Sequence, residues 1–576
     1  MSHRARLILL ILSAAAVYLL GNDRVPLWDR DEPRNAQAAR QMYQSGDWVV
    51  PRYLDKVRTA KPVLTYWCQA GVMHAIGDTP FAARLPSTVF MLLTLTVLAV
   101  ALTRATDRER AFWTVFILAT SAIVIAWTAK TSLTDSVQLL WITIAQLCLF
   151  RVVRGDATWP VVITMALAIG LAGLTKGPVV LGVLGATVLA WALLSWLGRP
   201  ARVLAAPAAD VAARLHATEA PPARPGHRRS AAKGLVIGAL KGIVALMIVA
   251  AVVGPWLWLV ERRAPGFLGI SVANDVIRRS LEPLEQHYGP PGYYALVLWG
   301  IFMPWSVLLP LTFALAWRHR DDARVRFALS AVVGPWLLLE AVRTKLPHYL
   351  LPAFPPLAYL LADAIVTCLR GQARDLTTRG TVFAVGAWAT IVAALGLLPA
   401  LAAARMTDLP RAPAVAIAVT GVAYATVVFW FFLDRQPRRG LVAMGGGMMV
   451  VMALMFSWYL PRARFMQLSM SLADVLKQHG GGGRDTPPGD VQMIGYKEPS
   501  LAFYQGGTIR EQPQNDFLLA RPPGQWPRWL VVREDVWGRM PPDVRARWDE
   551  VGQHRGLNLA DRGRAWTVHV LRRRPL

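Results

Sequence analysis

The residues best suited to chemistry lie in one charged stretch near the N-terminus, residues 27–67. Five charged side chains of both signs come within six positions there: Asp29, Arg30, Asp31, Glu32 and Arg34. Pro33 follows two acids, which is a helix-start signal. We therefore expect Asp31 or Glu32 at a helix N-terminus, where free N–H groups and the helix dipole favour a carboxylate. Taken alone, the same pattern also fits a well-capped surface helix.

Four further polar segments are predicted to lie on the same face as this stretch: residues 129–135, 174–178, 274–305 and 344–352. Asp135 stands out, because a carboxylate at the edge of an apolar segment is costly unless it is paired or functional. Lys61 or Arg34 could pair with it.

The other polar residues in these segments have simpler interpretations. Lys176 and Lys345 could extend to lipid head groups. The aromatic residues Tyr293, Tyr294, Trp299 and Trp305 could form an interfacial belt. His287 and His348 fit satisfied loop histidines better than a metal pair.

Together these segments combine acids with several lysines and arginines, and they lack a metal-ligand cluster. That combination fits a site for a phosphate-bearing lipid. Arginine and lysine bind phosphate oxygens and stabilise charge on a departing phosphate. A carboxylate can activate a nucleophile or stabilise cation character at a sugar carbon.

Composition defines the elements that must position these residues. The 576 residues are 54% hydrophobic and 17% charged, against roughly 25% charged in soluble domains. The apolar residues form runs of about 20, the length that spans a bilayer. The chain is therefore predicted to be a polytopic α-helical membrane protein. The net charge of +26 does not indicate nucleic-acid binding, because the basic residues lie in short loops. Three isolated cysteines predict neither disulfides nor a zinc site.

About thirteen spans are predicted, and basic residues orient them. Residues 7–20 would form a retained first span with a cytoplasmic N-terminus, which leaves the loop 21–79 outside. The later spans are expected at 80–103, 111–128, 133–150, 158–174, 178–197, 234–258, 292–316, 327–343, 350–368, 380–404, 412–433 and 440–460. The arginine-rich loops then all fall in the cytoplasm, together with the loop 198–233, which reads as a disordered linker.

The composition changes after this membrane domain, residues 1–465. Residues 466–489 are predicted to be a linker, and residues 490–576 a small extracytoplasmic α/β domain. Strand-like runs occur at 491–494, 529–532 and 566–571, with amphipathic stretches such as 542–551 between them.

Several motifs resemble one family across nearly the whole chain. Asp31-Glu32-Pro33-Arg34, residues 45–52 and Lys61-Pro62-Val63-Leu64-Thr65-Tyr66-Trp67 are similar to the first loop of the bacterial aminoarabinose transferases. These enzymes group with protein O-mannosyltransferases in the GT-C class of polyprenyl-phosphate-dependent glycosyltransferases. Further matches lie at 174–178, 287–305, 345–352 and 495–504; Val63 replaces the second proline of the usual KPPL motif.

The resemblance implies inverting transfer of a sugar from undecaprenyl phosphate to a lipid A-type acceptor, at the outer face of a bacterial inner membrane. Asp31 would be the catalytic carboxylate, held by Arg34 and Lys61, and Asp135 the second acid. Lys61, Arg278 (in preference to Arg279) and Tyr349 would hold the donor phosphate. The possible site-lining residues are Glu32, Arg58, Lys176, His287, Lys345 and His348. The resemblance implies neither a catalytic metal nor a cofactor.

Alternative functions remain open at this point. The acceptor could be a protein hydroxyl or another glycan, for which Asp31 would be a true general base. A lipid or solute transporter would also have many spans, but transporters tend to place ionisable groups at mid-membrane and to contain repeats. An assembly or sensor protein would not explain the charged first loop.

Overall fold

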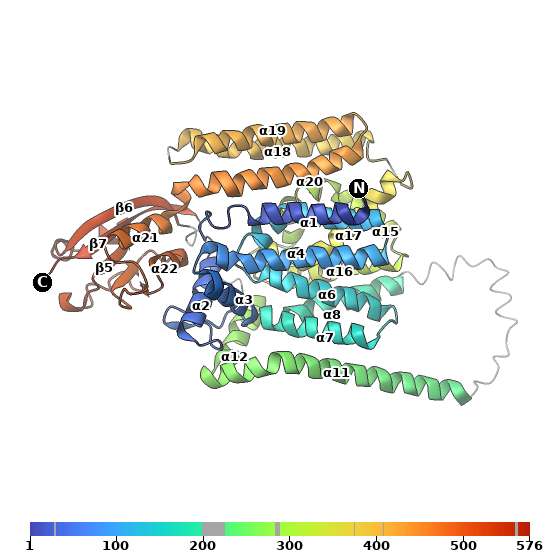
Figure 1. Ribbon diagram of the computed structural model, residues 1–576, viewed down its shortest axis with the longest axis horizontal. Helices are drawn as coiled ribbons and strands as arrows, with labels where there is room; N and C mark the ends of the chain where they lie inside the picture. The colour runs from blue at the N-terminus through green and yellow to red at the C-terminus, as the bar shows by residue number, and fades with distance from the viewer. Residues whose placement is uncertain are drawn as a thin grey trace.

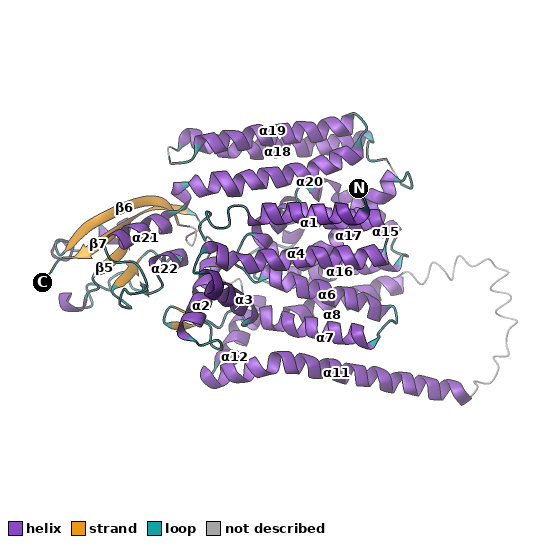
Figure 2. Ribbon diagram, in the orientation of Figure 1, coloured by secondary structure: helices purple, strands orange, loops and turns teal. Residues whose placement is uncertain are grey.

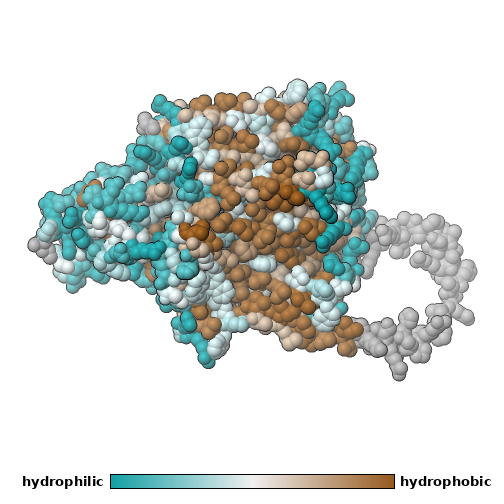
Figure 3. All heavy atoms as spheres, viewed as in Figure 1, coloured by the Kyte–Doolittle hydropathy of each residue, from teal (hydrophilic) through white to brown (hydrophobic). Residues whose placement is uncertain are grey.

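A helical bundle followed by a small β-sheet makes up the protein. The computed structural model describes residues 1–27, 30–197, 225–282, 288–373, 375–406, 408–558, 561 and 563–575. Figures 1 and 2 show the helices lying side by side, with the sheet at one end of the bundle. Figure 3 shows a broad apolar band across the visible face of the bundle, between two hydrophilic ends. This is the surface expected of a chain that crosses a membrane.

Nine helical segments in the described residues are long and apolar enough to cross a membrane. They contain α4 (Pro80–Ala105), α6 (Asp135–Val153), α7 (Trp159–Lys176), α8 (Val179–Leu197), α11 (Pro225–Arg263), η5 (Pro347–Ala353) with α17 (Phe354–Leu369), α18 (Arg379–Arg405), α19 (Arg411–Leu433) and α20 (Pro437–Leu454). The chain is therefore a multi-pass membrane protein.

The four other predicted spans are also helical, but they are shorter, interrupted or more charged. They correspond to α1 (His3–Leu19), α5 (Arg108–Thr120) with η1 (Val124–Ala129), α14 (Tyr293–Ile301) with α15 (Leu309–Arg318), and α16 (Ala323–Ala341). The total of thirteen spans thus stays a prediction. Residues 198–224 of the predicted loop 198–233 lie outside the described residues, whereas residues 225–233 belong to α11 instead of a disordered linker.

The first loop contains the two helices that carry its charged motif. They are α2 (Asp31–Ser45) and α3 (Leu64–Ile76), separated by a hairpin of β1 (Arg52–Tyr53) and β2 (Lys56–Val57). The predicted helix start is confirmed, because α2 begins at Asp31. The helix ends at Gly46, whose φ of 73° is the left-handed conformation that glycine adopts without a steric penalty.

The sheet near the C-terminus has the strand order β4-β3-β5-β7-β6. The strands are β3 (Val491–Ile494), β4 (Arg510–Gln512), β5 (Trp529–Arg533), β6 (Trp548–Asn558) and β7 (Arg564–Arg573). β3, β4 and β5 are parallel, whereas β7 runs antiparallel to both β5 and β6. The three predicted strand runs lie within β3, β5 and β7.

Two stretches near the sheet differ from the sequence-based expectation. The stretch 542–551 divides into a short helix, α24 (Pro542–Arg545), and the start of β6. Part of the predicted linker 466–489 forms α21 (Leu468–Gln478), because its apolar face, with Leu472 and Leu476 fully buried, covers the sheet.

Helix α22 (Pro499–Gln505) joins this sheet region to α2. The Arg40 guanidinium of α2 is 4% exposed, donates to the Phe503 carbonyl at 3.0 Å, and lies 4.6 Å from the Phe503 ring centroid. The Leu27 amide also donates to the Tyr504 hydroxyl at 2.6 Å. The sheet region therefore holds the helix that begins with Asp31.

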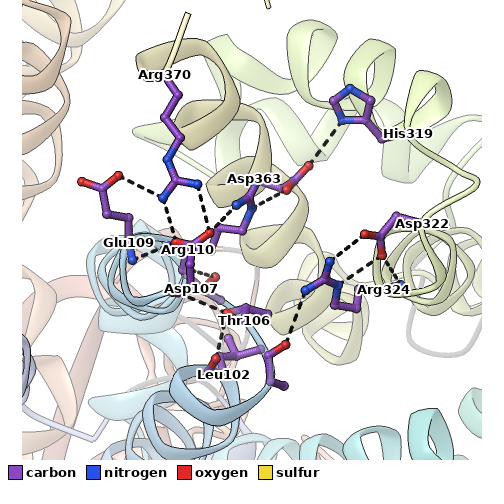
Figure 4. Close-up of polar contacts among 12 residues, drawn as sticks. Leu102, Thr106, Asp107, Glu109, Arg110, His319, Asp322, Arg324, Asp363 and Arg370 are labelled. Atoms are coloured by element: carbon purple, nitrogen blue, oxygen red, sulfur yellow. Dashed lines mark hydrogen bonds and ion pairs between the residues drawn. The ribbon is translucent and has the colours of Figure 1, made fainter. Parts of the chain in front are cut away.

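An ion-pair cluster joins helices at the end of the bundle farther from the sheet (Figure 4). Arg110 of α5 donates to Asp363 of α17 at 2.6 Å and also pairs with Asp107, and Arg370 reaches Asp107 at 3.2 Å. Arg438 of α20 pairs with Glu109 at 3.1 Å. Three of the predicted arginine-rich loops, those near residues 104–110, 370–379 and 435–439, therefore lie on the same side of the bundle.

Candidate active site

Asp31 lies at the exposed start of α2 and faces an excess of cations. Its side chain is 57% exposed, and its Oδ1 lies 3.5 Å from Arg58 Nη2. Arg58 itself is 9% exposed; it donates to the Tyr66 hydroxyl at 2.9 Å and to Asn35 Oδ1 at 3.0 Å. Asn35 lies one turn after Asp31 on α2, and Tyr66 lies on α3. The two loop helices thus fix Arg58 beside the carboxylate.

The surroundings of Asp31 set its protonation state. Desolvation by the surrounding protein would raise its pKa, but the charges of Arg58, Lys61, Arg34 and Arg279 together outweigh that effect and lower the pKa to about 2. Asp31 is therefore a carboxylate at neutral pH and a weak proton acceptor. The charges of Arg34 and Lys61 act on Asp31, and both residues were predicted to hold it. The direct ion pair, however, is with Arg58, which was predicted only as a possible site-lining residue.

Glu32 lies in the protein interior next to the site and does not line it. It is fully buried and receives two hydrogen bonds from Arg84, of 2.7 and 3.0 Å. The Ser132 amide donates to the same carboxylate at 2.9 Å. Arg84 is 1% exposed and also donates to the backbone carbonyls of residues 22, 25 and 26. The pair ties α2 to α4 and to the loop before α6.

Sequence reasoning missed Arg84, although it carries a recognisable signal. An arginine inside an apolar segment predicts a buried acidic partner. The partner could not be chosen from sequence, because Glu32 lies 52 positions away.

Asp135 begins α6 and forms the second acidic centre. It is 8% exposed, and its Oδ1 accepts from Lys176 Nζ at 2.7 Å. The Trp127 indole N–H donates to its Oδ2 at 3.4 Å. The direct partner is thus Lys176 at the end of α7, instead of the suggested Lys61 or Arg34. The Lys61 charge nevertheless acts on Asp135 as well as on Asp31.

Tyr349 and His348 lie between the two acidic centres. The His348 ring stacks on Trp127 with centroids 4.6 Å apart, and Lys176 Nζ lies 5.5 Å from the Tyr349 ring centroid. The charges of Asp31 and Asp135 both act on His348. Predicted residues from four separate segments therefore meet in one site.

The arginine that contacts this site is Arg279, so the preference for Arg278 is not supported. Arg279 Nη1 donates to the Tyr349 hydroxyl at 2.8 Å. Arg278 instead lies on an exposed surface, with Glu282 Oε2 at 3.4 Å and Asn274 Oδ1 at 3.3 Å. Successive helical residues point about 100° apart, so a one-residue difference changes which face an arginine occupies.

Lys345 is neutralised beside the site. It is 5% exposed and pairs with Glu340 at 2.6 Å, and Glu340 also accepts from the Tyr294 amide at 3.0 Å. Glu340 lies in an apolar helix, which is a signal that the sequence analysis did not use. His287 lies outside the described residues, and no group of three His, Cys, Asp or Glu residues that could hold a metal occurs among the described ones.

The balance of charges determines what the site can bind. Among the residues that the structure describes, two carboxylates, Asp31 and Asp135, face five cations: Arg34, Arg58, Lys61, Lys176 and Arg279. The surplus of positive charge favours a ligand with several negative charges, such as a phosphate group.

Comparisons with known proteins show which proteins this chain resembles. A family profile described as dolichyl-phosphate-mannose-protein mannosyltransferase matches residues 60–212. The undecaprenyl phosphate-alpha-4-amino-4-deoxy-L-arabinose arabinosyl transferase of Serratia proteamaculans is 28% identical over 402 residues, which is 68% of this chain and 66% of that protein. The corresponding transferase of Yersinia enterocolitica is 28% identical over 382 residues, covering 65% of this chain and 62% of the relative. The matches thus span just under two thirds of the relatives' length.

A solved structure extends the likeness over the whole chain. The crystal structure of ArnT from Cupriavidus metallidurans bound to undecaprenyl phosphate superposes with a TM-score of 0.72, at 19% identity, over 98% of this chain and 97% of that one. This chain is similar to the aminoarabinose transferases and has the GT-C fold of that structure. The predicted family resemblance is confirmed.

Proposed function

We propose that this protein is an inverting glycosyltransferase that moves a sugar from a polyprenyl-phosphate carrier to a lipid A-type acceptor. The observation that carries the proposal is the surplus of cations around Asp31 at the end of a membrane bundle. The carrier's phosphate would enter beside Lys61, Arg279 and Tyr349, which can neutralise its charge as it departs. The two named relatives act on undecaprenyl-phosphate aminoarabinose, and the ArnT structure holds undecaprenyl phosphate.

The reaction is written with the acceptor oxygen as the nucleophile. An oxygen of the acceptor attacks the anomeric carbon, the bond from that carbon to the carrier phosphate breaks, and the carrier leaves as polyprenyl phosphate. Attack opposite the leaving group inverts the configuration. Asp31 stabilises the positive character that develops at the sugar ring, while the cations hold the departing phosphate.

The surplus of cations around Asp31 favours an acceptor that is already negatively charged. Arg58 lies 3.5 Å from Asp31, and the charges of Arg34 and Lys61 also act on that carboxylate. A phosphate acceptor is anionic at neutral pH, so these cations attract it and it needs no base. A neutral hydroxyl gains nothing from them. The charge balance thus favours a lipid A phosphate over a protein hydroxyl.

The proposal includes the orientation and division of the chain. Residues 1–465 would form the transferase domain in a bacterial inner membrane, with about thirteen spans and a cytoplasmic N-terminus. Residues 490–576 would form an extracytoplasmic domain that follows the segment 466–489. The loop 21–79 and the sheet then share the periplasmic side, where Arg40 joins α2 to α22.

The test compares sugar transfer by the wild type and Asp31→Asn. The full-length protein, purified in detergent, is incubated with synthetic undecaprenyl-phosphate aminoarabinose and lipid A, and the product is followed by mass spectrometry. Asp55→Asn is the matched control, because Asp55 is an exposed acid in the same loop. We expect Asp31→Asn to lose at least 100-fold in rate and Asp55→Asn to match the wild type.

Three outcomes would contradict the proposal. Equal transfer by wild type and Asp31→Asn would remove Asp31 from the chemistry. If the wild type did not modify lipid A but glycosylated a peptide or another glycan, the acceptor assignment would be wrong. If it moved labelled carrier lipid across proteoliposomes without transferring sugar, the protein would be a transporter.

A further inference from the structure

A cavity that is open to the surface lies at the other end of the bundle from the candidate active site. Its volume is about 920 Å³, within the range of roughly 300–1,000 Å³ common for ligand pockets. It lies between the end of α17, the end of α19 and the start of α20. Its lining residues are Leu369, Phe431, Gln436, Pro437, Arg438, Arg439, Val442 and Ala443.

The cavity has an apolar side and a basic side. Leu369, Phe431, Val442 and Ala443 are apolar and lie on helices that cross the membrane. Val442 is 48% exposed, and the nearby Trp430 and Leu433 are each 54% exposed, so this wall continues onto the lipid-facing surface. Arg438 and Arg439 provide the basic side. This arrangement matches a molecule with acyl chains and a negatively charged head group.

The charge around the cavity favours an anion. The turn 434–439 holds three arginines against one aspartate, Asp434. Arg438 is 57% exposed and shares Glu109 with Arg370, whereas Arg439 contacts only the uncharged Gln436 among the described partners. The positive charge is thus only partly neutralised within the protein.

We propose that this cavity binds an anionic glycerophospholipid of the adjacent leaflet. The phosphodiester would lie against Arg438 and Arg439, and an acyl chain would lie against Phe431 and Val442. Basic pockets between membrane helices bind anionic head groups in this way. Since Arg438 reaches Glu109 on α5, and Arg370 on α17 reaches the same acid, a lipid there would join the start of α20 to the cluster in Figure 4.

The experiment measures lipid binding to the full-length protein after delipidation in detergent. Native mass spectrometry would follow phosphatidylglycerol, phosphatidylethanolamine and inorganic phosphate in separate titrations. One basic residue near a lipid surface contributes roughly a fivefold change in affinity, and two contribute about 30-fold. We therefore expect Arg438→Gln/Arg439→Gln to bind phosphatidylglycerol about 30-fold more weakly than the wild type. Arg320→Gln is the matched control, because Arg320 lies on the same side outside the cavity and donates to the Trp317 carbonyl.

Two further variants separate lipid binding from folding. Arg439→Gln leaves the Arg438–Glu109 ion pair intact and should weaken phosphatidylglycerol binding about fivefold. Ala443→Trp should fill the apolar side and weaken binding while keeping both arginines. Equal binding of phosphatidylethanolamine, full competition by millimolar phosphate, or unchanged phosphatidylglycerol binding by the double variant would each overturn the proposal.

Discussion

The two charged clusters of this protein lie at opposite ends of the bundle and differ in charge balance. In the cluster of Figure 4, Asp107, Glu109, Asp322 and Asp363 face Arg110, Arg324 and Arg370. Arg438 of α20 adds a fourth arginine, which pairs with Glu109. In the described part of the candidate active site, two acids face five cations. The balanced pairs join helices and leave no net charge for a ligand, except at the edge where Arg438, which shares Glu109 with Arg370, lies next to Arg439. An unbalanced cluster is stabilised when an anion enters.

Replacing Arg84 should give the largest effect, which is a loss of stability. This substitution tests the buried Arg84–Glu32 ion pair next to the active site. Arg84→Met leaves the carboxylate of Glu32 buried without its partner, which costs about 3–5 kcal/mol. We expect a large drop in thermal stability, measured by tryptophan fluorescence in detergent. The double variant Glu32→Gln/Arg84→Met should recover part of the loss, because it removes the uncompensated charge. A stable, active single variant would contradict the ion pair.

A crossed pair of substitutions tests the difference between the clusters directly. Lys61→Met should lower the rate of sugar transfer about 100-fold and leave the melting temperature nearly unchanged, because Lys61 lies in the unbalanced site. Arg110→Met should lower the melting temperature and leave the rate of sugar transfer nearly unchanged, since Arg110 holds α5 to α17 through Asp363. The test measures the rate of sugar transfer and the melting curve of each variant. If both variants lose stability alike, the two clusters have the same role.

Arg279 and its neighbour Arg278 provide a matched comparison within the site. Arg279→Gln should raise the KM for the carrier-linked sugar about tenfold, because it removes a charged donor that contacts Tyr349. Arg278→Gln should leave KM within twofold, because Arg278 pairs with exposed partners. Steady-state kinetics with a synthetic donor measure both values. The reverse order would restore the sequence-based preference for Arg278.

The smallest expected effect concerns acid pH. The depressed pKa of Asp31 keeps its charge, and its contribution to stability, at pH values above its ordinary pKa near 3.8. That contribution is lost only as the pH falls through about 2. Arg58→Gln removes one of the lowering charges, so the pKa rises. The ratio of variant to wild-type activity should then fall by roughly a factor of two between pH 5 and pH 4. A constant ratio would show that Arg58 does not set this pKa.

Much of this organisation could be predicted from sequence because its signals are local. Apolar runs gave every long helix near its observed position, and the acids before Pro33 gave the start of α2. The motif residues Asp31, Lys61 and Tyr349 also meet at one site. Local patterns of this kind depend on neighbours within one or two turns.

The remaining features depend on distant partners, which one sequence does not specify. Arg84 meets Glu32, Lys176 meets Asp135, and Arg110 meets Asp363 across 253 positions. The packing of whole helices determines which residues form each of these pairs. The distinction between Arg278 and Arg279 failed for a related reason, because it depends on the helical phase of a segment that includes the π-helix η2 (Val272–Arg278).

The contact of Arg40 with Phe503 also has a consequence for biosynthesis. Asp31 is made among the first residues, but the carbonyl and ring that hold its helix belong to residues made more than 450 positions later. A ribosome-bound chain that has completed all its membrane helices still lacks this support. Assembly of the site is therefore a late event, and a nascent chain stopped before α22 carries the acid without the contact that fixes its helix.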